Sequence, residues 1–168
     1  LKVTIKMADF SFDIVSKVDY MELDNALNQA DRELTTRFDF KNTGVKIEKD
    51  GEKILIEAQT EERAKAALDV FKDKLIKRGV SQKHIDPGLP VLSGKIYKIV
   101  VPIKEGISQE HAKKLAKSLR DDGPKTIKTQ IQGDELRVSS KSKDDLQEAI
   151  AFVKAQDLDF APQFTNFR

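Results

Sequence analysis

A pattern of strand, tight turn, strand and helix occurs twice in this chain, and this repetition constrains the fold more than any other feature. The clearer copy lies in residues 126–155, where apolar and polar residues alternate on both sides of Gly133-Asp134, as in a β-hairpin with a two-residue turn. Ser142, with Asp145 three residues later, then predicts a helix start. The apolar residues of that helix recur at helical spacing, at Leu146, Ala149, Ile150 and Val153.

Residues 45–79 form a weaker copy of the same pattern. Asp50-Gly51 is a strong hairpin signal, and Thr60 precedes a second apolar helical stripe that ends before Gly79. Each copy is itself preceded by a predicted strand and a predicted helix. Both halves therefore predict the order strand, helix, strand, turn, strand, helix, which indicates a duplicated unit.

This βαββα order predicts the α+β class, with two small sandwiches that each have an antiparallel sheet covered by helices on one face. The segment 81–93 contains Pro and Gly and has no periodicity, so it is interpreted as the junction between a domain at 7–93 and a domain at 94–168. Residues 1–6, which precede Met7, are interpreted as a leader or an upstream extension.

The predicted strand at 94–103 has apolar residues on both faces, as expected of a strand buried on both sides or shared between two sheets. Each repeat also lacks one strand of a complete sheet. We therefore hypothesise that residues 10–18 or 94–103 are exchanged between the sheets, so that the two domains are interlocked. Independent folding of a 1–92 fragment with native-like stability would contradict this hypothesis.

Composition excludes several classes of protein and points weakly to one kind of partner. The 168 residues include 30 basic and 28 acidic ones, and the net charge of +2 does not indicate a nucleic-acid-binding protein. Residues 104–143 hold 10 basic and 6 acidic residues, so an anionic partner is expected to bind there. The chain has no cysteine, no signal peptide pattern and no apolar run near the roughly 20 residues of a membrane-spanning helix. We expect a cytoplasmic protein without membrane association.

The sequence contains no recognisable catalytic or metal-binding motif. Its two histidines, His84 and His111, lack the spacing of metal ligands, and both are expected to be ordinary surface residues. A glycine-rich phosphate loop and a nucleophile elbow are also missing. We therefore predict that the protein is not an enzyme and uses no cofactor or metal, and we keep catalysis as a third hypothesis.

Two groups of side chains could bind an anionic ligand. The first lies on the third predicted helix, opposite its apolar stripe, and is either a phosphate-binding surface or a solvated helix face: Lys113, Lys117 and Arg120. The second is the outward face of the last hairpin, either a site for phosphates and base edges or only a polar sheet surface: Lys128, Gln130, Gln132 and Arg137. Lys141, beside Ser142 at the fourth helix start, either adds an anion site or belongs to a helix cap alone.

The outward hairpin positions lack the aromatic residues on which RNA-recognition sheets stack bases. These positions are Glu135, Arg137 and Ser139 in one repeat and Lys53, Leu55 and Glu57 in the other. The stacking platform is therefore absent from both hairpins.

Five segments, in this order, resemble the bacterial YajQ family. They are SFDIVSKVD (11–19), RFDFKN (37–42), KLIKRG (74–79), KTQIQGDELRVSSKSKDDLQ (128–147) and QFTNFR (163–168). The resemblance runs from about Met7 to the C-terminus. It implies a tandem of RNP-like, ferredoxin-like α+β domains in a cytoplasmic protein that binds nucleotides. For some members it also implies a link to RNA, or to cyclic di-GMP as a receptor that acts on transcription.

From the residues and the resemblance we predict a non-catalytic protein that binds RNA, a nucleotide or a cyclic dinucleotide through the basic surface of its second half. The alternative is an interaction protein, such as a partner of a transcription factor, without a direct role in nucleic-acid binding. We expect a monomer or a weak oligomer.

Overall fold

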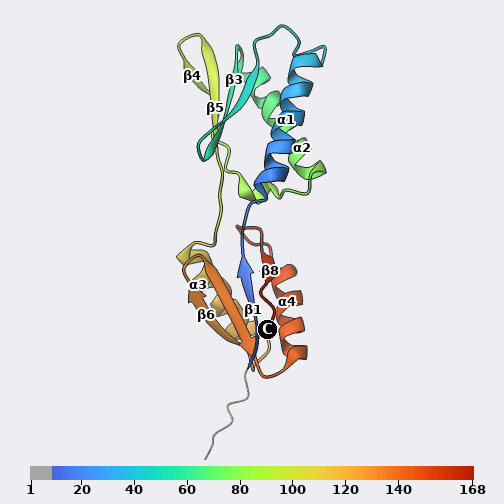
Figure 1. Cartoon of the computed structure of the whole chain (residues 1–168). Coiled ribbons are helices and arrows are strands. Elements are labelled where there is room, and N and C mark those ends of the chain that lie inside the picture. The colour runs from blue at the N-terminus through green and yellow to red at the C-terminus, as the bar shows by residue number, and fades with distance from the viewer. Residues whose placement is uncertain (1–8) are drawn as a thin grey trace, which may run out of the picture. The chain divides into compact units, whose positions relative to one another are not determined.

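The computed structural model describes residues 9–168, so the interpretation of residues 1–6 concerns a segment outside the described part. Two four-stranded antiparallel sheets each have helices on one face (Figure 1), which confirms the predicted α+β class. In chain order the elements are β1 (Phe10–Val15), α1 (Tyr20–Thr36), β2 (Lys46–Asp50), β3 (Lys53–Ala58), α2 (Glu61–Lys77), η1 (Gln82–His84), β4 (Val91–Ser93), β5 (Ile96–Pro102), α3 (Gln109–Asp122), β6 (Lys128–Gln132), β7 (Glu135–Ser140), α4 (Lys143–Lys154) and β8 (Gln163–Thr165). None of the described helices is long and apolar enough to cross a membrane.

Residues 18–105 form one compact unit around a sheet with the strand order β2-β3-β5-β4. Alternate residues of its two inner strands face the helices and are fully buried: Ile54, Ile56, Ile99 and Val101. Helices α1 and α2 pack against them, with Leu23, Ala30, Phe71 and Leu75 in this core. The other face of the sheet carries no helix of this unit (Figure 1).

The second compact unit combines residues 9–17 with residues 106–168, and its strand order is β6-β7-β1-β8. The inner strands β7 and β1 again alternate, and the residues that face α3 and α4 are fully buried: Phe12, Ile14, Leu136 and Val138. Leu115, Leu119, Ala149 and Val153 of the two helices pack against them. The two sheets therefore have the same strand arrangement, but the inner strand comes first in this unit, as β1, and last in the other, as β5.

Local sequence signals explain where the helices and turns occur. In every α-helix the N-cap side chain accepts a hydrogen bond from the backbone N–H three residues later; the caps are Asp19, Thr60, Ser108 and Ser142. Both predicted hairpin turns form, with Gly51 at φ 61° and Gly133 at φ 60°, a region that favours glycine.

The strand order shows which distant parts of the chain share a sheet. β1 lies between β7 and β8, and β5 lies between β3 and β4. The first strand of the chain thus belongs to the sheet of the second half, and β5 belongs to the sheet of the first half. The limits of the two units differ from the predicted ranges 7–93 and 94–168, because periodicity marks strands but not their pairing partners.

The expectation that residues 94–103 are buried on both sides was wrong. Ile99 and Val101 face the helices and are fully buried, whereas Val100 between them is 41% exposed. The strand β5 belongs to one sheet, in which it pairs with β3 and β4. Its outward apolar side chains therefore lie on an open sheet face.

In each unit, a hydrogen bond joins the segment through which the chain enters to the segment through which it leaves. The N–H of Gly106 donates to the carbonyl oxygen of Ser16 at 2.6 Å in one unit. In the other unit the N–H of Val18 donates to Oε2 of Glu105 at 2.8 Å. The entering and leaving segments of each unit are therefore adjacent within that unit.

We expect a fragment of residues 18–105 to fold and a fragment of residues 1–92 to remain unfolded. The 1–92 fragment lacks β5, which pairs on both of its edges and supplies Ile99 and Val101 to the core. A two-stranded hairpin without this strand has marginal stability. Urea unfolding followed by circular dichroism should show a cooperative transition for 18–105 and none for 1–92. A cooperative transition of equal midpoint for both fragments would contradict this topology.

Candidate functional site

The first predicted group lies on α3, in the helix layer of its unit. Lys113, Lys117 and Arg120 are exposed there, whereas Leu115 faces the core. Lys113 and Lys117 make no ion pair with any residue of the described range, and Nε of Arg120 lies 3.6 Å from Oδ1 of its neighbour Asp121. This group is a solvated basic surface without a cavity or a buried anchor of its own.

The second predicted group lies on the opposite side of the sheet, on the open face that we call the polar face. Cross-strand pairs bring its members together: Gln130 is opposite Arg137, and Gln132 is opposite Glu135. Because strand residues alternate, these side chains point away from the buried Leu136 and Val138. The structure thus assembles Lys128, Gln130, Gln132 and Arg137 on one surface. The sheet lies between these four residues and α3.

Lys141 is exposed between the end of β7 and the start of α4. The polar groups around it form a helix cap: Ser142 Oγ accepts from the Asp145 N–H at 3.2 Å, and Ser140 Oγ accepts from the Ser142 N–H at 3.1 Å. Thr126 Oγ1 contacts both Ser140 Oγ and Asp145 Oδ2. These contacts support the capping alternative for this segment.

Sequence reasoning missed the residue at the centre of the polar face, Asp13 of β1. Its side chain is 2% exposed, and Oδ1 accepts a hydrogen bond from Nε of Arg137 at 3.0 Å. Oδ2 accepts a second hydrogen bond from Nδ2 of Asn166 at 2.9 Å. These partners are 124 and 153 residues away in the sequence, so no local motif connects them to Asp13. The only sequence signal is an acidic residue at an outward position of a predicted strand.

The surroundings of Asp13 lower its pKa. Burial alone would raise the pKa, but the hydrogen bonds from Arg137 and Asn166 and the positive charges of Arg137 and Arg168 outweigh this effect. Two backbone hydrogen bonds between Arg168 and Ser11, at 2.9 and 3.3 Å, keep Arg168 near β1. Asp13 is therefore ionised at neutral pH and ties β7 and the segment after β8 to the central strand.

The pairing with Asp13 leaves Arg137 able to bind a further acceptor. A guanidinium group has five N–H donors, and Asp13 occupies the one on Nε. The four donors on the terminal nitrogens match two oxygens of one phosphate group. Because the side chain is 30% exposed, an acceptor from solvent can reach it. Asp13 holds the guanidinium in one orientation, which lowers the entropy lost on binding.

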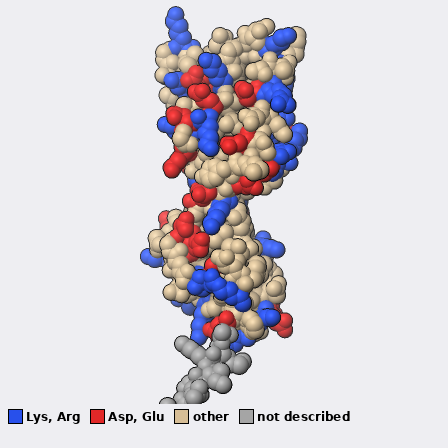
Figure 2. All heavy atoms as spheres, viewed as in Figure 1, with Lys and Arg blue, Asp and Glu red and all other residues tan. Residues whose placement is uncertain are grey.

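The polar face is hydrogen-bonding rather than strongly basic. The charged residues on it or next to it are Lys17, Lys128, Arg137, Arg168, Asp13 and Glu135. Lys17 Nζ lies 3.9 Å from Oε1 of Glu135. The uncharged polar residues at its strand positions are Ser11, Gln130, Gln132, Ser139, Gln163 and Thr165. On the surface drawn in Figure 2, basic and acidic side chains are likewise interspersed.

The aromatic rings around β1 pack on the helix side of the sheet. Phe12 is fully buried there, and its ring centroid lies 5.8 Å from that of Phe164 and 5.9 Å from that of Phe167. The outward positions of β1 are Ser11, Asp13 and Val15. All three are buried, so β1 offers a base neither an accessible surface nor a ring on which to stack.

His84 is buried, so the expectation of a surface residue was wrong. It is 4% exposed, and Nδ1 lies 3.1 Å from the carbonyl oxygen of Lys104. The next residue, Ile85, is itself buried and pairs with Ile103, which directly follows β5. In residues 9–168 no group of three or more His, Cys, Asp or Glu side chains could hold a metal ion.

A cavity of about 210 Å³ lies between α3 and residues 156–160. His111 lines it, with its ring stacked on Phe160 at a centroid distance of 6.0 Å and Nε2 at 3.5 Å from Oδ2 of Asp159. Asp157 and Asp159 give the cavity an acidic lining, and Lys114 is the one Lys or Arg among its lining residues. This charge disfavours an anionic nucleotide.

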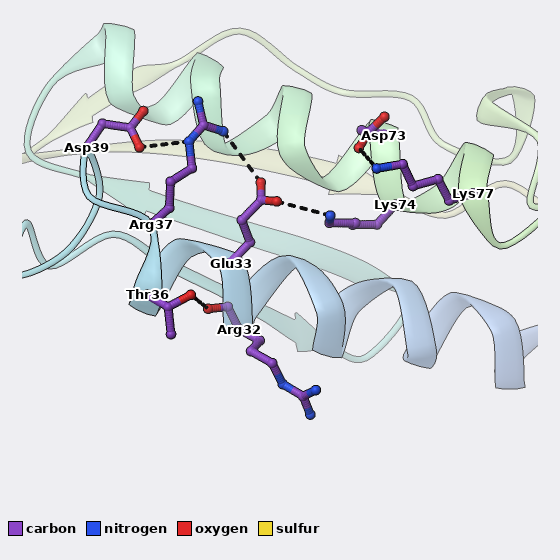
Figure 3. A network of polar contacts seen from close by, with 8 residues as sticks. All are labelled: Arg32, Glu33, Thr36, Arg37, Asp39, Asp73, Lys74 and Lys77. Atoms are coloured by element: carbon purple, nitrogen blue, oxygen red, sulfur yellow. Dashed lines mark hydrogen bonds and ion pairs between the residues drawn. The ribbon is translucent and has the colours of Figure 1, made fainter.

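A second cavity, of about 290 Å³, lies between α1 and α2 beside the ion-pair network drawn in Figure 3. Glu33 of α1 contacts Arg37 at 3.5 Å and Lys74 of α2 at 3.1 Å. Arg37 also contacts Asp39 at 2.8 Å. The network joins the two helices and the loop after α1. Since carboxylates predominate in the cavity lining, this region does not favour an anionic ligand either.

Comparison with known proteins places the chain in a family. The family model described as "Nucleotide-binding protein YajQ-like" matches residues 10–168. A nucleotide-binding protein of Streptomyces griseus is 65% identical over 96% of this chain and 100% of the relative. Proteins of Streptomyces coelicolor and Nocardia farcinica, also named as nucleotide-binding, are 63% and 61% identical over the same shares. The chain therefore belongs to the YajQ-like family of nucleotide-binding proteins, which confirms the resemblance seen in its sequence.

Proposed function

We propose that this protein binds single-stranded RNA on its polar face, without catalysis and in the cytoplasm. The proposal rests mainly on one observation: Lys128, Gln130, Gln132 and Arg137 share the polar face, and Asp13 holds Arg137 in place. The name of the family, nucleotide-binding, supports a ligand of this class.

The shape of the polar face suits an extended strand. Neighbouring β-strands are about 4.8 Å apart, so four strands span about 15 Å, and RNA-recognition sheets of this kind contact two or three bases. Glutamine amides can both donate to and accept from base edges, whereas lysine and arginine contact phosphates. Gln130 and Lys128 lie on the edge strand β6, where a ligand strand can reach them from solvent.

The chemistry of the face predicts weak and salt-dependent binding. Base stacking on aromatic side chains contributes about 1–3 kcal/mol per base in single-strand-binding proteins, and the strand positions of the polar face offer no ring. Binding must then depend on hydrogen bonds and on phosphate contacts, whose strength falls with salt. A compact cyclic dinucleotide fits this flat surface less well, because small ligands usually occupy enclosed sites.

We expect Lys128→Glu to weaken the binding of a short single-stranded RNA about tenfold at low salt, because it replaces a phosphate contact with repulsion. Lys117→Glu, which changes the charge equally but lies on α3, should change the affinity less than twofold. Fluorescence anisotropy with a labelled RNA of about 12 nucleotides, at several salt concentrations, measures both. Lys128→Glu should also reduce the slope of log affinity against log salt by about 0.7.

Three other outcomes would contradict this proposal. A larger loss for Lys117→Glu, or for Lys113→Glu with Lys117→Glu, would assign RNA binding to α3 instead. Salt-insensitive binding of cyclic di-GMP, unchanged by Lys128→Glu, would indicate a defined pocket elsewhere. No binding of RNA, nucleotides or cyclic dinucleotides would favour the alternative of an interaction protein, such as a transcription-factor partner.

We also expect Asp13→Asn to lower the free energy of unfolding at pH 7 by about 3 kcal/mol, because it leaves Arg137 partly buried without its counter-charge. Since the pKa of Asp13 is lowered in the folded state, its stabilising effect is complete above the unfolded pKa and is lost as the pH falls through the folded pKa. The variant should therefore lose less stability than the wild type between about pH 5 and pH 2.

Urea unfolding at several pH values measures this difference. Glu135→Gln is the matched control, because Glu135 lies on the same face in a longer, more exposed pair with Lys17 and should contribute less than about 0.5 kcal/mol. Equal stabilities of Asp13→Asn and wild type at pH 7 would show that Asp13 does not anchor the polar face.

A further inference from the structure

The open face of the sheet of residues 18–105 differs in chemistry from the polar face, and we call it the mixed face. The strand register arranges its residues in three rows that cross β2, β3 and β5. The middle row is Glu48, Leu55 and Val100. On one side lies the row Lys46, Glu57 and Lys98, and on the other side lies the row Asp50, Lys53 and Pro102.

The centre of the mixed face is apolar and accessible. Val100 is 41% exposed, and its cross-strand partner Leu55 is partly buried. On the edge strand β4, Val91 lies opposite Lys98 on the same face and is 64% exposed. Exposed apolar side chains framed by polar ones are typical of a surface that binds protein.

The charges of the mixed face exclude a nucleic acid and favour a protein partner. Its three rows contain three lysines and three carboxylates: Lys46, Lys53, Lys98, Glu48, Asp50 and Glu57. Within the unit, Lys98 Nζ lies 3.7 Å from Glu57 Oε1. A face with no net charge does not attract a phosphate backbone. It can instead match a partner of the same mixed charge.

The arrangement of these charges is self-complementary. On β2, Lys46 and Asp50 lie on opposite sides of the middle row and have opposite charges. On β3, Glu57 lies on the same side of the middle row as Lys46, and Lys53 lies on the same side as Asp50. The charges on β3 are therefore reversed relative to those on β2. A two-fold axis along the middle row would therefore bring each positive end of one copy against the negative end of the other.

We propose that the mixed face binds a second copy of this chain, in a symmetric dimer with the two sheets face to face. Leu55 and Val100 lie on the axis and contact their own counterparts, Lys46 meets Asp50 of the second copy, and Lys53 meets Glu57 of the second copy. Both contacts occur twice, as in any interface with the same patch on both subunits. Packed sheets of this kind keep their strand directions within about 30°. This inference is independent of RNA binding by the polar face.

The size of the mixed face indicates a weak dimer. Four strands span about 15 Å and a five-residue strand is about 17 Å long, so the face is smaller than the roughly 800 Å² per partner of a standard interface. We expect a dissociation constant in the micromolar range, which agrees with the expectation of a monomer or weak oligomer. One like-charge contact remains, because Glu48 also lies on the axis and faces its own counterpart.

A pair of charge-reversed variants tests the proposed register. The Lys53→Glu variant has carboxylates at both positions 53 and 57, and the Glu57→Lys variant has lysines at both. In a dimer of either variant, like charges would face each other. The dissociation constant of each variant should therefore be at least tenfold higher than that of the wild type. Mixed in equal amounts, the two variants regain opposite charges at both contacts. The mixture should then form a heterodimer, which sedimentation velocity over a series of concentrations detects.

Two further variants test the apolar centre and the axis. Val100→Lys should abolish dimer formation, whereas Ile76→Lys, at a residue of α2 that is 62% exposed and away from the mixed face, should leave it unchanged. Glu48→Gln should strengthen the dimer, because it removes the like-charge contact. Urea unfolding at low protein concentration verifies that each variant is folded.

A wild-type chain that stays monomeric at about 1 mM would overturn the proposal, since a micromolar dimer is formed fully at that concentration. So would a dimer that persists in Val100→Lys, because that dimer would use another surface. A mixture of Lys53→Glu and Glu57→Lys that dissociates as readily as each variant alone would overturn the two-fold register.

Discussion

Each sheet depends on an inner strand that comes from the opposite half of the chain. β1 supplies Phe12 and Ile14 to the core of one unit, and β5 supplies Ile99 and Val101 to the core of the other; all four residues are fully buried. Without its inserted strand, each sheet would be reduced to a hairpin and a separate edge strand. Since an isolated hairpin has marginal stability, neither half of the sequence contains a complete core of its own.

The strand β1 also connects the core to the candidate site. Successive residues of a strand point to opposite faces, so the same six residues place Phe12 against the helices and Asp13 on the polar face. Burial of Phe12 and Ile14 thereby fixes the register in which Asp13 meets Arg137. Asp13 in turn orients the guanidinium that we assign to phosphate binding. Packing and the proposed function therefore depend on one strand register.

The two units share a strand arrangement but differ in what their open faces can bind. The polar face presents amides, hydroxyls and an arginine held by Asp13. The mixed face presents Leu55 and Val100 between lysines and carboxylates of equal number. A fold does not determine a function, because the outward strand positions change freely while the inward ones maintain the core. In this chain the duplicated fold provides two surfaces of different chemistry.

The sequence by itself determined the helices and most strands of this protein, but not η1, β4 or β8. The hairpin turns at Gly51 and Gly133, the helix caps and the alternation that places Lys128, Gln130, Gln132 and Arg137 on one face are local properties, so they could be predicted. Only the tertiary structure decided the partners of β1 and β5, the burial of His84 and the role of Asp13. Asp13 and Arg137 are 124 residues apart, and periodicity gives the face of a residue but not the strand beside it. Strand pairing depends on the free energy of the complete core, which no local segment contains.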